Sequence, residues 1–174
     1  MVKLTRHPRW LLAAFAFLAM LAAALSMNAQ VVAGAAFPAL SPAVLTGGAL
    51  PDTAGKVVIV DFWASWCAPC KASFPAYSRL QAAYAARGLV IVAVSVDDSA
   101  AAFTAFVAKL KPAFATVHDA EHRLVSVVQV PTMPTSYLLD RGGKVRFIHQ
   151  GFHGEPTERE LGKEIETLLA EPAP

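Results

Sequence analysis

An almost unbroken apolar segment leads into two closely spaced cysteines, and this stretch constrains the fold more than any other part of the chain. Residues 57–62 read Val-Val-Ile-Val-Asp-Phe, which is typical of a strand buried on both faces of a parallel sheet. Apolar side chains then recur at helical spacing from residue 67 to about residue 87, and Gly88 marks a helix end. The sequence therefore predicts a central strand that turns directly into a helix, with Cys67 and Cys70 in its first turn.

These two cysteines are the only ones in the chain. A helix N-terminus leaves backbone N–H groups free and carries the positive end of the helix dipole, so it favours a thiolate at Cys67. Two cysteines cannot supply four zinc ligands, and a staple across so short a loop removes little chain entropy. The pattern favours a redox dithiol in which Cys67 attacks and Cys70 resolves. Neither Ala68 nor Pro69 supplies a further donor to the thiolate, which favours a reductant over a strong oxidant.

The surrounding residues carry a family resemblance. Residues 61–70, Asp-Phe-Trp-Ala-Ser-Trp-Cys-Ala-Pro-Cys, resemble the active-site segment of thioredoxin-fold proteins. Gly55-Lys56 before the strand and Phe74-Pro75 after the cysteines resemble the TlpA/ResA/CcmG-like family of exported thiol–disulfide oxidoreductases. The resemblance implies an α/β thioredoxin-like fold with a mixed central sheet and helices on both faces. It also implies an enzyme, a protein-disulfide reductase that needs no cofactor.

Asp61 interrupts the apolar strand, where an isolated charge is expensive to bury. The resemblance implies that this carboxylate lies below Cys70 and accepts its proton. In thioredoxin a lysine on the neighbouring strand pairs with the carboxylate, whereas the alignment places Ala93 at that position here. We therefore expect a strongly raised pKa for Asp61. The alternative is a purely structural, hydrogen-bonded aspartate.

Further along the chain, Met133-Pro134-Thr135 resembles the loop that faces the disulfide in this family, in which the proline is cis. The resemblance implies that the Met133 backbone lies beside Cys67 and pairs with an extended segment of the substrate. Trp66 is expected to form an exposed apolar wall for partner docking, with ordinary packing as the alternative. Trp66, Met133, Pro134 and Thr135 are thus the predicted substrate-binding residues.

Residues 1–29 form a predicted targeting segment, in which Lys3, Arg6 and Arg9 precede an apolar run over residues 11–27. This charge asymmetry predicts a signal peptide or an N-terminal membrane anchor. Either would export the domain to the periplasm or to the outer face of the cytoplasmic membrane. If the leader is retained, residues 11–27 contact the membrane.

The rest of the chain divides into two parts. Residues 30–51 are rich in Ala, Pro and Gly and predict a tether and irregular extension, with a short hairpin near residues 47–48. Residues 52–174 form the thioredoxin-like domain, whose strand–helix–strand–helix run holds one helix–strand pair more than a minimal thioredoxin. The last helix is expected to begin at Thr157, in a capping box with Glu160. After Gly88 we expect strands over residues 89–96, 113–117, 135–139 and 144–150 and helices over residues 98–110, 120–128 and 157–170.

Charge and composition limit the classes of molecule that this protein is expected to bind. Without the three basic leader residues the chain has 12 basic and 13 acidic side chains, so nothing indicates a nucleic-acid surface. We expect protein disulfides as substrates, with cysteines of apocytochrome c or of an oxidase copper site as the targets that the resemblance implies. A membrane thiol–disulfide donor would supply the electrons.

Two rival functions remain open. One is a Cu(I) carrier that uses the same two cysteines as soft ligands, and the other is an envelope disulfide oxidant. Histidines occur four residues apart at 118 and 122 and at 149 and 153. Neither pair lies on a continuous predicted helix, so we predict no metal site from them.

Overall fold

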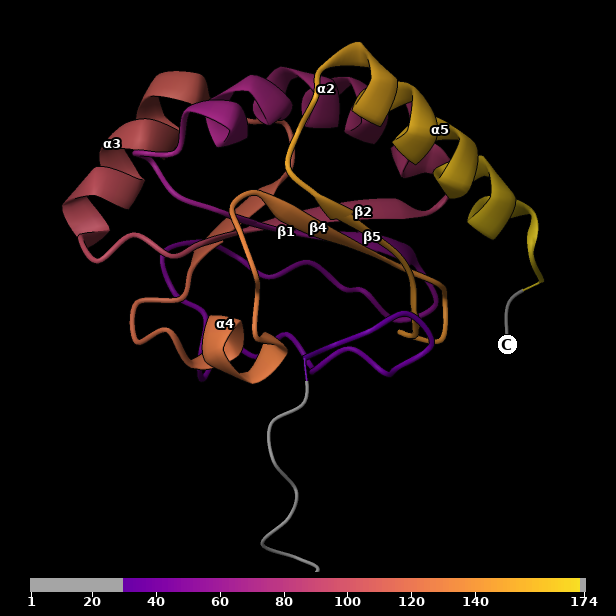
Figure 1. Ribbon diagram of the computed structural model, residues 1–174, viewed down its shortest axis with the longest axis horizontal. Helices are drawn as coiled ribbons and strands as arrows, with labels where there is room; N and C mark the ends of the chain where they lie inside the picture. Colours follow the sequence, from indigo (N-terminus) through magenta and orange to yellow (C-terminus); the bar gives the residue numbers. More distant parts are fainter. Residues whose placement is uncertain (1–29, 173–174) are drawn as a thin grey trace, which may run out of the picture.

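The computed structural model describes residues 30–172, and the predicted leader, residues 1–29, lies outside the described residues. Its centre is a five-stranded sheet in the order β3-β2-β1-β4-β5 (Figure 1). The first three strands are parallel, and β4 and β5 are antiparallel to their neighbours. The strands are β1 (Val57–Trp63), β2 (Leu89–Ser95), β3 (Ala115–His118), β4 (Thr135–Leu139) and β5 (Val145–Gln150).

Every residue of β1 is buried, as its apolar sequence predicts for a strand with neighbours on both sides and layers on both faces. The chain moves from β1 to β2 to β3 in one direction across the sheet, so right-handed crossovers place both connecting helices on the same face. Figure 1 shows α-helices on that face and a shorter α-helix on the opposite face. The helices are α2 (Ala68–Tyr84), α3 (Ala100–Leu110) and α5 (Glu155–Ala170) above the sheet and α4 (Arg123–Val128) below it.

Two apolar layers enclose the sheet. Above it, the ring of Trp63 lies 5.0 Å from that of Phe74 and 4.5 Å from that of Phe106, so β1, α2 and α3 meet in one aromatic cluster. Below it, the ring of Tyr137 packs against those of Phe62 and Phe37. This arrangement confirms the predicted thioredoxin-like α/β fold with its mixed sheet.

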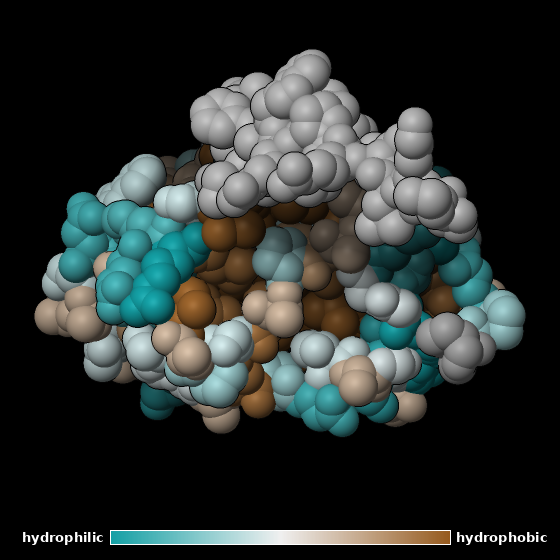
Figure 2. Space-filling model, turned by 90° about the horizontal axis from the view of Figure 1, so that it is seen from below, coloured by the Kyte–Doolittle hydropathy of each residue, from teal (hydrophilic) through white to brown (hydrophobic). Residues whose placement is uncertain are grey.

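The extension over residues 31–51 is irregular, as expected, but it does not hang free as a tether. The Val31 N–H donates to the Val128 carbonyl at 3.1 Å, and Leu45 is buried. In place of the expected hairpin at residues 47–48, Thr46 forms a β-bridge with His118 at the end of β3. The reason is that α4 has only six residues, so the extension has to cover the rest of the lower apolar face. Figure 2 views this face from below and shows apolar side chains gathered in a hollow.

The predicted start of the last helix is wrong by two residues. Helix α5 begins at Glu155 with Gly154 as its N-cap, and Pro156 occupies the first turn, where its missing N–H costs nothing. Thr157 is therefore the third helical residue and cannot form the N-cap of a capping box. Its hydroxyl oxygen instead accepts a hydrogen bond from the His153 N–H at 3.1 Å. Across residues 30–172, the helices all lack the length and apolarity that a membrane span requires.

Candidate active site at the head of helix α2

Cys67 and Cys70 form a disulfide, with their Cα atoms 5.3 Å apart. Cys67 is the N-cap of α2, and its sulfur accepts a hydrogen bond from the Cys70 N–H at 3.2 Å. The sulfur therefore occupies the place where a serine or aspartate oxygen usually satisfies a free N–H group. Cys70 is fully buried and Cys67 is 5 % exposed, whereas Ala68 and Pro69 between them are exposed. An incoming group thus meets the Cys67 end of the disulfide.

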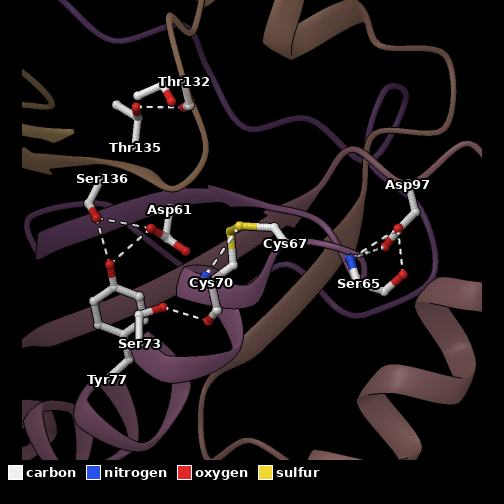
Figure 3. Close-up of a disulfide and its surroundings, with 10 residues drawn as sticks. All are labelled: Asp61, Ser65, Cys67, Cys70, Ser73, Tyr77, Asp97, Thr132, Thr135 and Ser136. Atoms are coloured by element: carbon white, nitrogen blue, oxygen red, sulfur yellow. Dashed lines mark hydrogen bonds between the residues drawn. A yellow bond between two sulfur atoms is a disulfide. The ribbon is translucent and has the colours of Figure 1, made fainter. Parts of the chain in front are cut away.

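Asp61 lies in β1, where its carboxyl is fully buried. Its Oδ1 accepts hydrogen bonds from the hydroxyls of Tyr77 and Ser136, each at 2.9 Å, and these two hydroxyl oxygens are 2.6 Å apart. Its Oδ2 has no hydrogen-bond partner among the described residues. In Figure 3 the hydroxyls approach one oxygen while the other lies on the side of the disulfide.

The electrostatics of this carboxyl follow from its burial. Desolvation raises the pKa of Asp61 from 3.8 to about 7, although the hydrogen bonds from Tyr77 and Ser136 act to lower it. On β2, Ala93 is the direct neighbour of Asp61, as the alignment predicted, so no lysine stands at that position. Burial and the nearby Asp61 charge raise the pKa of Tyr77 well above its usual value, so this phenol keeps its proton. The expected rise in the Asp61 pKa is confirmed in direction.

The predicted loop precedes β4, the strand that pairs with β1. The Met133–Pro134 peptide bond is cis, as predicted. Met133 is half-buried and packs against the apolar cluster that contains both cysteines, and neither of its backbone groups has a hydrogen-bond partner within residues 30–172. Thr135 is buried and its hydroxyl donates to the Thr132 carbonyl at 2.8 Å, so this side chain shapes the loop from inside.

Trp63, the last residue of β1, and Trp66, in the segment that joins β1 to α2, have opposite surroundings. Trp63 is fully buried, whereas Trp66 is 67 % exposed, as a docking surface requires. Between them, Ser65 is fixed by the buried carboxylate of Asp97, which accepts from the Ser65 N–H at 3.0 Å and from its hydroxyl at 2.7 Å. This anchor sets the path of the chain into Cys67.

Sequence reasoning missed three of these residues. Tyr77 falls within the apolar helical pattern of residues 67–87, and the sequence pattern assigns no role to Ser136 or Asp97. The one available signal was polarity: a serine two residues after the cis-proline and a tyrosine two helical turns after Cys70 are unusual polar choices on buried faces. Their convergence on Asp61 depends on strand register, which periodicity does not give.

The histidine pairs are used elsewhere in the fold. The rings of His118 and His122 each donate through Nε2 to backbone carbonyls, those of Asp97 at 2.6 Å and Val96 at 3.1 Å. His149 lies on β5, where its Nε2 is 2.6 Å from a carboxylate oxygen of Glu164 on α5. The rings of His118, His122 and His149 thus link neighbouring parts of the fold.

A strand–turn–helix unit with a dithiol pair at the helix head and a cis-proline loop against the same cluster defines a thioredoxin-fold protein with a disulfide site. The comparisons with known sequences give the family within that class. The chain belongs to the AhpC/TSA family, whose pattern matches residues 45–148. Within this group it is ResA-like, which confirms the TlpA/ResA/CcmG-like family predicted from the sequence.

Curated relatives include the thiol–disulfide oxidoreductases ResA of two organisms. The protein from Oceanobacillus iheyensis is 36 % identical over 102 residues, which are 59 % of this chain and 53 % of that protein. The protein from Bacillus thuringiensis subsp. konkukian is 31 % identical over 119 residues, 68 % of this chain and 67 % of that protein. The match therefore spans about half of the Oceanobacillus relative and two thirds of the Bacillus one.

Solved structures of related proteins superpose on this chain. A putative thiol:disulfide interchange protein DsbE from Chlorobium tepidum superposes with a TM-score of 0.74 at 34 % identity, covering 81 % of this chain and all of that chain. StoA from Bacillus subtilis superposes with a TM-score of 0.56 at 26 % identity, covering 63 % of this chain and 82 % of its own. Both superpositions extend well beyond the cysteine segment.

Proposed function

We propose that this chain is an exported thiol–disulfide oxidoreductase that reduces protein disulfides through Cys67 and Cys70. The observation that carries the proposal is the disulfide at the head of α2, with the Cys67 sulfur in the N-cap position. On reduction, the same N–H groups and helix dipole stabilise a Cys67 thiolate, which lowers the pKa of that thiol and makes it nucleophilic near neutral pH.

The reaction would proceed in two exchanges. The Cys67 thiolate attacks one sulfur of a partner disulfide, a mixed disulfide forms, and the other partner sulfur leaves as a thiolate. Cys70 then loses its proton, attacks the Cys67 sulfur and releases the second partner sulfur. The partner gains two electrons, and the protein ends in the disulfide form described above. A thiol donor in the membrane would return the two electrons.

The direction of electron flow and the targets are the finer part of the proposal. Ala68 and Pro69 are exposed and contribute no side-chain donor to the Cys67 sulfur, which favours a reductant. Export rests on the leader sequence. The expectation that the targets are cytochrome c haem-attachment cysteines or oxidase copper-site cysteines rests on the family resemblance.

Substrate docking would use the surface around the exposed Trp66 and the backbone groups of Met133, which are unpaired within residues 30–172. An extended substrate segment can pair with those backbone groups as an added strand, while its side chains contact the indole. In this arrangement the scissile disulfide meets the 5 % of Cys67 that remains exposed.

The proposal is tested by trapping. In a Cys70→Ser protein the first exchange still occurs, but no second thiol resolves it, so envelope proteins should accumulate as mixed disulfides with Cys67. Non-reducing gels followed by mass spectrometry of the thiol-released partners would identify them. The control is the Cys67→Ser/Cys70→Ser double variant, which should capture nothing. Equal capture by both variants, or none by either, would count against the proposal. A Cu(I) carrier would instead bind the metal stoichiometrically and reduce no insulin.

A second expected result concerns docking. Trp66→Ala should slow insulin reduction about tenfold. A change of that size corresponds to the binding energy that an aromatic anchor at the edge of a site typically contributes. Reaction with a small disulfide such as dithiobis(nitrobenzoate) should be unchanged, since it makes no such contact. Stopped-flow rates with both substrates separate the two cases, and an equal loss with both would assign Trp66 to the chemistry of Cys67.

A further inference from the structure

We infer that Tyr77 and Ser136 are positioning residues for the second exchange: they hold Oδ1 of Asp61 so that Oδ2 receives the proton of Cys70. The inference rests on the proposed function and adds two residues to it. Their hydroxyls hydrogen-bond to Asp61 and to each other, so both residues would act through Asp61.

Three elements bring the groups together. Asp61 stands in the middle of β1, and Ser136 is its direct partner on the antiparallel strand β4. Tyr77 lies two helical turns after Cys70 on α2, so both side chains leave the helix on the face that covers the sheet. Their hydroxyls contact each other at 2.6 Å and both reach Oδ1 at 2.9 Å. One carboxylate oxygen is therefore fixed from two directions.

The other oxygen of this carboxyl, Oδ2, has no hydrogen-bond partner among the described residues. A fully buried carboxylate oxygen without a hydrogen-bond partner is costly, and native structures rarely keep one without a reason. Figure 3 shows this oxygen on the side of Cys67 and Cys70. Turning the carboxyl away from this orientation would lengthen both hydroxyl bonds, and a half-turn only exchanges two equivalent oxygens. The hydroxyls thus keep the unpartnered oxygen directed to the thiol.

The groups that face Asp61 are few. From α2 they are Tyr77 and Cys70, from β4 Ser136, and from β2 Ala93. Ser73, also on α2, uses its hydroxyl on the Cys70 carbonyl at 2.8 Å. The pKa of Asp61 depends on its burial and on the hydrogen bonds from the two hydroxyls, and no charged side chain among the described residues contributes to it. Each donor stabilises the ionised carboxylate and so keeps its pKa lower than burial alone would set it.

The Cys70 S–H proton moves to Oδ2 of Asp61, and the Cys70 thiolate attacks the Cys67 sulfur of the mixed disulfide. The Cys67–Cys70 bond forms, the bond to the substrate sulfur breaks, and that sulfur leaves as a thiolate. The rate should therefore rise with pH as Asp61 ionises.

Dithiobis(nitrobenzoate) isolates this step. The reduced protein releases one thionitrobenzoate when Cys67 attacks the reagent and a second when Cys70 displaces the group now bound to Cys67. The amplitude and rate of the second phase, followed by stopped-flow absorbance from about pH 5 to about pH 9, report the Cys70 attack. In Tyr77→Phe and in Ser136→Ala we expect the midpoint of this second phase to move up by about one pH unit, because each loses one donor to a charged acceptor. At pH 7 the second phase should then be about fivefold slower.

A matched control uses the same helix. Tyr84→Phe removes a hydroxyl that hydrogen-bonds a carboxylate of Glu166, at the far end of α2, and it should leave the midpoint in place. The first phase should be unchanged in all three variants, which shows that each is folded and that Cys67 is intact. An unmoved midpoint in both Tyr77→Phe and Ser136→Ala would overturn the inference. If the parent protein itself released no second thionitrobenzoate, the proposed dithiol function would fail instead.

Discussion

Asp61→Asn should stabilise the oxidised protein by about 4 kcal/mol more at about pH 8 than at about pH 4. Burial raises the pKa of Asp61 in the folded protein from 3.8 to about 7. Below pH 3.8 both the folded and unfolded states hold the proton, so burial of the neutral acid costs little. Between the two values only the folded state holds it, so stability falls as pH rises. Above pH 7 the folded state contains a buried carboxylate, and the free energy of unfolding falls no further from this group.

The measurement is urea unfolding of the parent and the variant at intervals across this range. The free energy of unfolding of Asp61→Asn minus that of the parent should increase steadily and then level off above about pH 7. The control is Asp98→Asn, at an exposed aspartate three residues after the end of β2. It should show no such increase. A difference that stayed constant with pH would mean that the buried carboxyl is ionised throughout, and the proton-acceptor role would lose its basis.

Trp63→Ala should destabilise the protein by about 3–5 kcal/mol, the usual range for deleting a fully buried large aromatic side chain. Trp63 is completely buried between Phe74, Phe103 and Phe106. Its Nε1 has no hydrogen-bond partner among the described residues, so the loss comes from packing and the cavity left behind. Chemical unfolding of the oxidised protein at one pH gives the free energy directly.

The same segment supplies the comparison. Trp66 lies three residues further on but is 67 % exposed, so Trp66→Ala should change the free energy of unfolding by no more than about 0.5 kcal/mol. Both variants replace a tryptophan by alanine, one at the end of β1 and the other three residues later, and the two side chains differ in burial. If they destabilised the protein equally, the aromatic cluster above the sheet would not be the core that the packing indicates.

Several elements could be predicted because their signals are local. A few consecutive residues predict each of three features: the apolar strand β1, the helix with Cys67 and Cys70 at its start, and the cis-proline before β4. All three occur as expected. The neighbour of Asp61 on β2 also followed from alignment with the family. Helix α5 was misplaced at its start because Thr157 and Glu160 fit a capping box by spacing, whereas Gly154 and Pro156 set the true first turn.

Other features depend on residues that are distant along the chain. The extension over residues 31–51 carries little periodicity, and only the short length of α4 on the lower face explains why it packs there. The anchor between Asp97 and Ser65 joins the ends of two strands, separated by 32 positions. Helical spacing correctly placed Tyr77 toward the sheet, but it could not say that its hydroxyl would meet a carboxyl.

The amino-acid sequence alone determined the central strand, the helix that follows it and the pairing of Cys67 with Cys70, because each is set by neighbours within a turn or two of backbone. Only the tertiary structure decided what surrounds Asp61. The register of β4 against β1 brings Ser136 opposite it, and the packing of α2 on the sheet brings Tyr77 to the same oxygen. A shift of one residue in that register would turn Ser136 to the other face, since side chains alternate along a strand.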